Sequence, residues 1–95
     1  MATIFDEIPF DAEARRRIEA SIQTYRRFAR VRFEMTLSGA VLQVRAVQYE
    51  PAPNGRVLTA DELRARALGV FEGLLPGGYE LVITSTPYQD EKEQV

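Results

Sequence analysis

An alternating stretch between Arg30 and Gln48 places the strongest constraint on the fold. On both sides of Ser38-Gly39 every second residue is apolar, which is typical of two strands that each bury one face. Glycine adopts the positive φ of tight hairpin turns, so we predict a two-residue turn at Ser38-Gly39. Pairing about this turn places eight apolar residues on one face: Val31, Phe33, Met35, Leu37, Ala40, Leu42, Val44 and Ala46.

The other face of the same hairpin is predicted to be charged. Pairing about Ser38-Gly39 sets Arg32 opposite Arg45, and two like charges directly across a strand pair are mildly destabilising. Glu34 lies diagonal to Arg45 in this register and would offset the repulsion locally. An acidic group supplied by a partner would do the same.

Two helices are predicted on either side of the hairpin in the sequence. The first runs from about Asp11, a good N-cap residue, to Arg30. The second begins at Thr59, because Thr59 and Glu62 have the spacing of a capping box, and it ends before the Pro-Gly-Gly of residues 76–78. The apolar stripe of the first helix is Ala14, Ile18, Ile22, Tyr25 and Ala29.

Residues 79–87 read as a third strand that ends at Pro87. The resulting order is α-β-β-α-β, and a crossover through the second helix places the third strand parallel to the second. We therefore predict an α+β fold, a two-layer sandwich with a three-stranded mixed sheet in the order 2-1-3 and two helices on one face. A type II KH-like arrangement or a split βαβ arrangement fits the same order of elements.

The length of 95 residues predicts a single domain, 1–95. We expect its core at about 10–87, with 1–9 and 88–95 loosely ordered. No apolar run approaches the ~18 residues of a membrane helix, and the acidic first ten residues lack the features of a signal peptide. We therefore expect a cytoplasmic protein of bacterial type and no contact with a membrane.

The chain contains no histidine and no cysteine, which narrows its chemistry. The usual general base at neutral pH, the commonest metal ligand and the thiolate nucleophile are all missing. No acidic residue falls on a predicted apolar face, where burial would shift its pKa for catalysis. No phosphate-loop or dinucleotide motif occurs. We therefore expect a protein that is not an enzyme, with no catalytic residues, no cofactor and no metal.

Arginine is concentrated in one part of an otherwise acidic chain. Residues 15–32 hold seven Arg against one Glu, whereas the formal net charge of the whole chain is -2. A basic helix face is a footprint of nucleic-acid binding, and Arg16, Arg27 and Arg30 fall opposite the apolar stripe. A solvated helix face with its own counter-charges explains the same residues, and the strands carry no aromatic RNA-binding pattern.

The sheet face that the helices leave uncovered is the preferred candidate for binding. It mixes apolar and charged side chains, and an apolar patch on a surface marks a contact. A homodimer is the simplest way to cover such a face or to pair a sheet edge. We therefore predict a small accessory module that acts through protein–protein contacts with a partner or with itself; nucleic-acid association is the alternative. The predicted interface residues are Arg32, Glu34, Val41, Gln43, Arg45, Val47, Val82 and Thr84.

Overall fold

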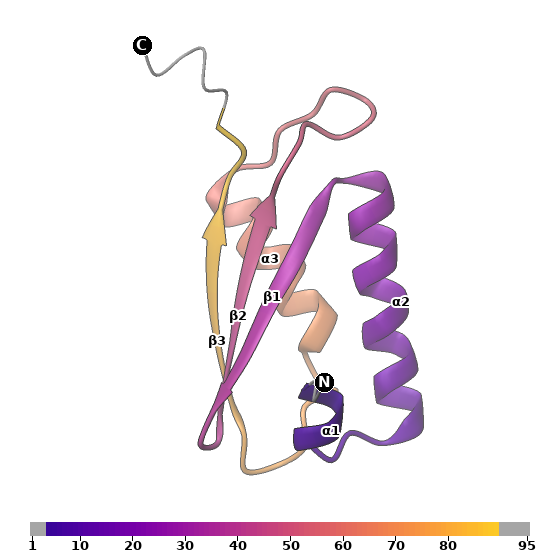
Figure 1. Cartoon of the computed structure of the whole chain (residues 1–95), viewed down its shortest axis with the longest axis vertical. Helices are drawn as coiled ribbons and strands as arrows, with labels where there is room; N and C mark the ends of the chain where they lie inside the picture. Colours follow the sequence, from indigo (N-terminus) through magenta and orange to yellow (C-terminus); the bar gives the residue numbers. More distant parts are fainter. Residues whose placement is uncertain (1–3, 90–95) are drawn as a thin grey trace.

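The computed structural model describes residues 4–89 and has a small α+β fold (Figure 1). A three-stranded mixed sheet packs with helices, as the sequence predicts. The elements in chain order are α1 (Ile4–Glu7), α2 (Ala12–Phe28), β1 (Val31–Ser38), β2 (Val41–Gln48), α3 (Ala60–Phe71) and β3 (Glu80–Thr86).

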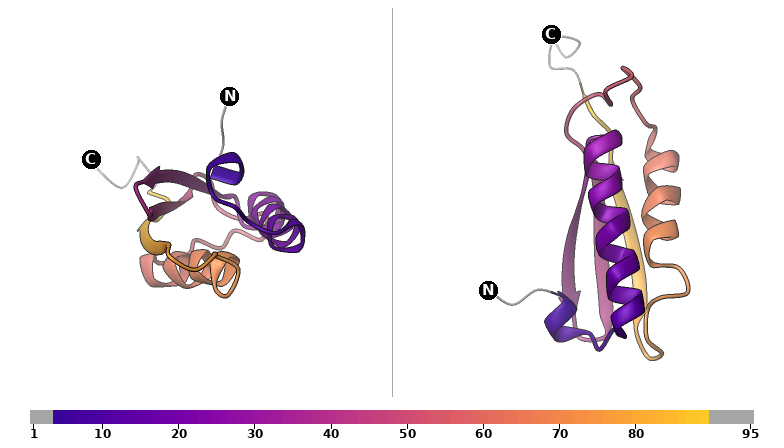
Figure 2. Two further views of the ribbon diagram at one scale, coloured as in Figure 1. Left: turned by 90° about the horizontal axis from the view of Figure 1, so that it is seen from below. Right: turned by 90° about the vertical axis from the view of Figure 1, so that its right-hand side faces the viewer.

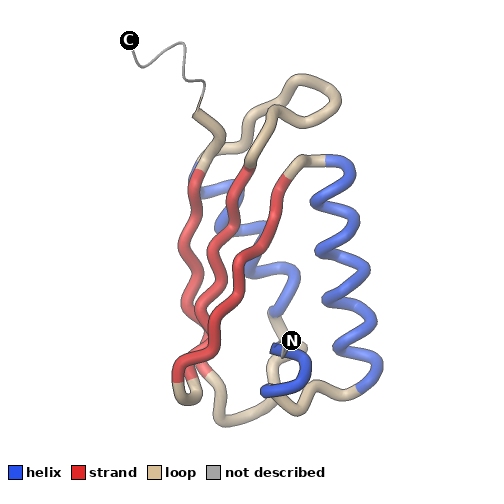
Figure 3. Tube along the Cα trace, viewed as in Figure 1, coloured by secondary structure: helices blue, strands red, loops and turns tan. Residues whose placement is uncertain are grey.

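The strands lie in the order β1-β2-β3, so the predicted order 2-1-3 is wrong. β2 is the central strand: it pairs antiparallel with β1 and parallel with β3 (Figure 3). The crossover through α3 returns the chain directly beside the strand that it left, as consecutive strands usually do. The far side of β1, where the predicted order places β3, is the side on which α1 and α2 pack (Figure 1).

The register of the hairpin differs from the predicted one by two residues. Ser38 pairs with Val41, so the turn is Gly39-Ala40 rather than Ser38-Gly39. Gly39 has a φ of 59°, and positive φ at the first turn position alone is the pattern of a type II′ turn, which places glycine there. Because the shift is two residues, the strand side chains keep their predicted faces, but their partners across the hairpin change. Ala40 is the exception: the prediction that it lies on the apolar face is wrong, because it is an exposed turn residue.

Both long helices pack against the same face of the sheet and bury it. α3 contacts β2 and β3, whereas α2 contacts β1 and α3 (Figure 2). Phe71 is the bulkiest of the fully buried side chains. The cluster that joins the sheet to these two helices contains Ile18, Val31, Phe33, Leu42, Val44, Ala46, Leu63, Ala67, Val70 and Phe71.

The ordered core extends further toward the N-terminus than the sequence suggests. Ile4 and Ile8 are only 5% and 1% exposed and belong to the core cluster, so the prediction that residues 4–9 are loosely ordered is wrong. The Phe5 and Phe10 rings pack with their centroids 5.7 Å apart. Residues 1–3 and 90–95 of the two predicted loose segments lie outside the described residues.

Both long helices begin at the predicted caps. Asp11 accepts a hydrogen bond from the Ala14 N–H at 2.7 Å. Thr59 and Glu62 form the complete capping box, each side chain accepting a backbone N–H at 3.1 Å. The hydrogen bond from the Thr59 backbone lowers the pKa of Glu62 below its usual value, and the nearby Arg56 guanidinium adds to this effect.

Gln48 is the one buried polar residue among those that the structure describes. Its amide nitrogen donates to the Ala29 and Arg56 carbonyls, both at 3.1 Å. Its amide oxygen accepts the Leu58 N–H at 2.7 Å. A single side chain at the end of β2 therefore fixes both the end of α2 and the loop that leads into α3.

Candidate interaction surfaces

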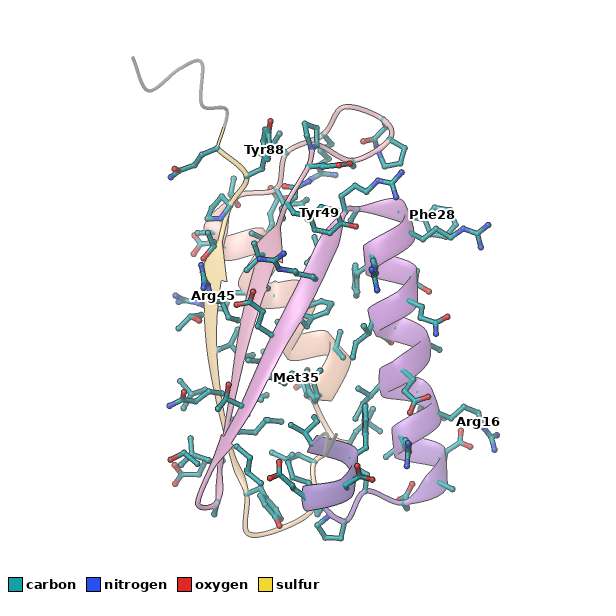
Figure 4. All side chains as sticks on the ribbon, viewed as in Figure 1. Arg16, Phe28, Met35, Arg45, Tyr49 and Tyr88 are labelled. Carbon is teal, nitrogen blue, oxygen red and sulfur yellow. The ribbon has the colours of Figure 1, made fainter. Side chains whose placement is uncertain are left out.

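The open face of the sheet is the face turned away from α2 and α3. Strand alternation places all eight predicted interface residues on it, and Figure 4 shows Arg45 projecting from it. The residues of the open face are Arg32, Glu34, Thr36 and Ser38 in β1, Val41, Gln43, Arg45 and Val47 in β2, and Glu80, Val82, Thr84 and Thr86 in β3.

Two arginines on the open face share one carboxylate. Glu34, and not Arg32, stands opposite Arg45, so the predicted like-charge pair is wrong. The Glu34 carboxylate lies 3.1 Å from the Arg32 guanidinium and 3.3 Å from that of Arg45. Arg45 Nε also donates to Thr86 Oγ1 at 3.0 Å. The two-residue shift in register causes this difference, and it removes the reason for expecting an acidic group from a partner.

The apolar side chains of the open face differ in how much surface they offer. Val47 is only 7% exposed, because it stands between Arg32 of β1 and Thr86 of β3 in the sheet, so it offers almost no surface to a partner. Val82 is 45% exposed. Val41, at the start of β2, is intermediate in exposure, so the most exposed apolar side chain of the open face is Val82 on β3.

A shallow depression of about 320 Å³ lies over the middle of the open face. This volume is at the lower end of the range for small-molecule sites. Its two charged groups, Glu34 and Arg45, already pair with each other. The residues that line it are Glu34, Thr36, Gln43, Val44, Arg45, Val82 and Thr84.

The outer edge of β3 is the second surface of interest. Glu80 N–H donates to the Ala40 carbonyl of the β2 side at 2.8 Å. Because backbone groups of successive strand residues point to opposite sides, the groups of Leu81, Ile83 and Ser85 point outward, away from β2. Within residues 4–89 only β2 pairs with β3, and no segment lies along its outer edge (Figures 1 and 3).

The outer edge of β3 carries only one of the usual features that prevent strand pairing, the charged residue Glu80 at its start. Natural edges carry charged residues, especially lysine, or proline or a bulge, or are covered by another element. β3 reads Glu-Leu-Val-Ile-Thr-Ser-Thr, and its register with β2 is continuous. Sequence patterns alone do not single out this edge, because the exposure of an edge depends on which elements pack along it.

The three arginines predicted to contact nucleic acid do not form one patch. Arg16 and Arg27 are roughly 16 Å apart along the axis of α2, and Figure 4 shows Arg16 and Phe28 at opposite ends of this helix. Arg16 lies 3.7 Å from Glu13, and Arg30 lies 3.8 Å from Glu50. Arg16 therefore belongs to a solvated helix face with its own counter-charge.

A different basic surface forms where α2 ends. The guanidinium of Arg27 lies 5.7 Å from the centre of the Phe28 ring, which is 65% exposed. Arg26, Arg32 and Tyr49 line a depression of about 330 Å³, and the Tyr49 hydroxyl donates to the Arg26 carbonyl at 3.3 Å. Neither Arg26 nor Arg27 has a carboxylate partner within residues 4–89. We call the basic end of α2 the set Arg26, Arg27, Phe28, Arg30, Arg32 and Tyr49.

The described part of the chain offers no metal site and no membrane-spanning helix. Within residues 4–89 no three acidic side chains are grouped so that they could hold a metal ion. None of the helices in that range has the length and apolar character required to cross a bilayer. The two sheet surfaces and the basic end of α2 are therefore the candidates that remain.

Comparisons with protein families, with curated proteins and with solved structures find no match to this chain. The function is therefore inferred from the surfaces described above.

Proposed function

We propose that this protein is a non-enzymatic binding module that associates with a second copy of itself through its sheet. The free outer edge of β3 carries the proposal. Within residues 4–89 this edge presents unpaired backbone donors and acceptors beside the exposed Val82, and its one charged residue, Glu80, lies at the start of the strand. The other edge of the sheet differs, because α1 and α2 pack against β1.

The character of the open face supports a contact role over a ligand-binding role. The charged groups that line its depression are already paired, and the Glu34 carboxylate that holds both Arg32 and Arg45 is about half exposed, as they are. Such pairs add little to stability. Each charged group of this cluster already has a partner, so a second protein can lie over it without burying an unpaired charge.

We expect the wild-type protein to dimerise reversibly, with a dissociation constant on the order of 1–100 µM, because edge pairing buries less area than a standard interface. Size-exclusion chromatography with light scattering, run over a range of loading concentrations, measures this. The mass should rise from the 10.8 kDa of one chain toward twice that value. A mass of one chain at every concentration up to about 1 mM contradicts the proposal.

The second candidate function is association with single-stranded nucleic acid through the basic end of α2. Surfaces that bind single strands combine arginines with exposed rings on which bases stack. Arg26 and Arg27 next to the exposed Phe28 supply this combination. We therefore propose the C-terminal end of α2, rather than the length of the helix, as the candidate nucleic-acid site.

Arg30→Gly tests nucleic-acid binding without an expected loss of stability. Arg30 has a φ of 56°, which is unfavourable for any side chain and normal for glycine after a helix. We expect this variant to be as stable as the wild type or more stable by up to about 1 kcal/mol in urea unfolding. Its affinity for a single-stranded oligonucleotide should fall, and the slope of the salt dependence should drop by about 0.7 for each phosphate that the variant no longer neutralises.

Arg16→Ala is the matched control, because Arg16 lies at the opposite end of α2 and pairs with Glu13. It should leave oligonucleotide affinity nearly unchanged. Absence of binding at about 20 mM salt, or an equal loss in both variants, removes the nucleic-acid candidate.

A further inference from the structure

We infer that two copies of the protein pair antiparallel along β3, about a two-fold axis at Ile83, to form one continuous sheet. The inference rests on the proposed self-association and specifies the strand and register that produce it. We infer a second copy as the partner because the backbone groups and the side chains of β3 are both compatible with pairing to an identical strand.

The outward backbone groups of β3 are arranged symmetrically about Ile83. Leu81, Ile83 and Ser85 direct their N–H and C=O groups away from β2. In an antiparallel pair centred on Ile83, this residue faces its own copy, and Leu81 faces Ser85 of the second copy. Every outward N–H then meets an outward C=O, which satisfies all the edge groups of the strand.

Other registers fit less well. A slip of one residue would invert one copy, so that its open face lies on the same side of the joined sheet as the helices of the other copy. Centring the pair on Val82 would place Ser85 opposite Tyr79, and centring it on Thr84 would place Leu81 opposite Pro87. Tyr79 and Pro87 both lie outside β3, and proline has no N–H to donate.

The side chains of β3 are also compatible with this self-pairing. Val82 stands opposite Thr84 of the second copy, a favourable combination of two β-branched residues. Glu80 stands opposite Thr86 of the second copy, so no like charges oppose each other. β3 has no other charged residue, which makes it electrostatically suited to pair with itself.

Two exposed apolar side chains belong to the elements next to this edge. Within residues 4–89 the exposed large apolar side chains are Phe28, Val57, Leu68 and Val82, and two of them belong to α3 and β3. α3 packs against β3, so edge pairing brings the two α3 helices to the same side of the joined sheet. Val82 then packs directly beside a side chain of the second copy.

Disulfide trapping with two single-cysteine variants tests the register directly. The chain contains no cysteine, so a thiol introduced by Val82→Cys or by Thr84→Cys is unique. In the inferred pair, position 82 of one copy lies directly opposite position 84 of the other, with Cα atoms about 4.5 Å apart, within disulfide range. Two thiols at position 82, or two at position 84, lie diagonally at about 7–8 Å.

The two variants are mixed in equal amounts, one of them labelled with ¹⁵N, and oxidised mildly before mass spectrometry. We expect cross-links between unlike chains to form at least about fivefold faster than cross-links between like chains, because only the unlike pair falls within disulfide geometry. Sheets that pack face to face are about 10 Å apart and give no such preference. Equal rates, or a preference for like pairs, overturn the inference.

Two further variants separate failure of this inference from failure of the proposed function. Ser85→Pro removes an outward N–H and leaves the bonds to β2 intact, so it should abolish both the dimer and the cross-link. Gln43→Lys alters the middle of the open face and should affect neither. If the dimer forms with Ser85→Pro but not with Gln43→Lys, the protein associates through the open face and the inferred pairing along β3 is wrong. If the wild-type protein is a monomer, both proposals are wrong.

Discussion

Replacement of Phe71 by alanine is expected to lower the free energy of unfolding by about 3–5 kcal/mol. Phe71 is fully buried at the end of α3, within the cluster that joins this helix to the sheet. Truncation removes the burial of an aromatic ring and leaves a cavity that the packed neighbours fill only in part. Urea unfolding followed by circular dichroism measures the change as a shift in midpoint at constant slope.

Phe28→Ala is the matched control for Phe71→Ala. The Phe28 ring is 65% exposed and contacts the Arg27 guanidinium, so its removal should cost less than about 1 kcal/mol. If Phe71→Ala does not fold, Phe71→Leu should still fold with a loss of about 1–2 kcal/mol. Equal effects of Phe71→Ala and Phe28→Ala would contradict the described core.

Gln48→Leu should cost about 2–4 kcal/mol even though it replaces a polar group by an apolar one of similar size. The Gln48 amide satisfies the Leu58 N–H and the carbonyls of Ala29 and Arg56. Leucine leaves all three backbone groups without this partner, and unsatisfied buried groups are costly. The measurement is again urea unfolding.

Gln43→Leu is the control in the same strand, because Gln43 is exposed on the open face and should tolerate the change within about 0.5 kcal/mol.

Gln48→Glu adds a pH dependence. Burial beside two carbonyl oxygens raises the pKa of the new carboxyl in the folded state above its unfolded value. In acid the protonated carboxyl has one donor for two carbonyl oxygens, so this variant should come closest to wild-type stability there. Relative to wild type, it should lose stability as the pH rises through the folded-state pKa. A loss of stability relative to wild type that is smaller at neutral pH than in acid would contradict the described contacts.

Local patterns predict the elements of this fold well. The α2 stripe places Ala14 and Ile18 in the core, and Thr59 with Glu62 forms the capping box that its spacing indicates. β3 spans Glu80–Thr86, within the predicted 79–87. Such signals depend on neighbours in sequence, which are visible without a structure.

The arrangement of the strands could not be predicted in the same way. Strand order depends on where α1 and α2 pack, and the short apolar spacing of Ile4 and Ile8 is too weak to reveal α1. The hairpin register depends on which turn position Gly39 occupies, and both choices keep the same alternation. The error of two residues produces the wrong partner for Arg45.

The candidate sites show the same division between local and long-range information. Alternation identifies the residues of the open face, but burial of Val47 and the ion pairs of Glu34 arise only from contacts between strands. The basic end of α2 brings Tyr49, after β2, next to Arg26 of α2. No sequence spacing reveals that contact.

The crossover gives β3 a distinctive place in local unfolding. β1 and β2 are joined by the turn Gly39-Ala40, whereas β3 is joined to β2 through residues 49–79, which include α3. Separation of β3 from β2 therefore also disrupts its packing with α3, so the two should open as one cooperative unit while the hairpin stays closed. A second copy bound to β3 would suppress that opening by mass action, so association would stabilise α3 as well as the strand.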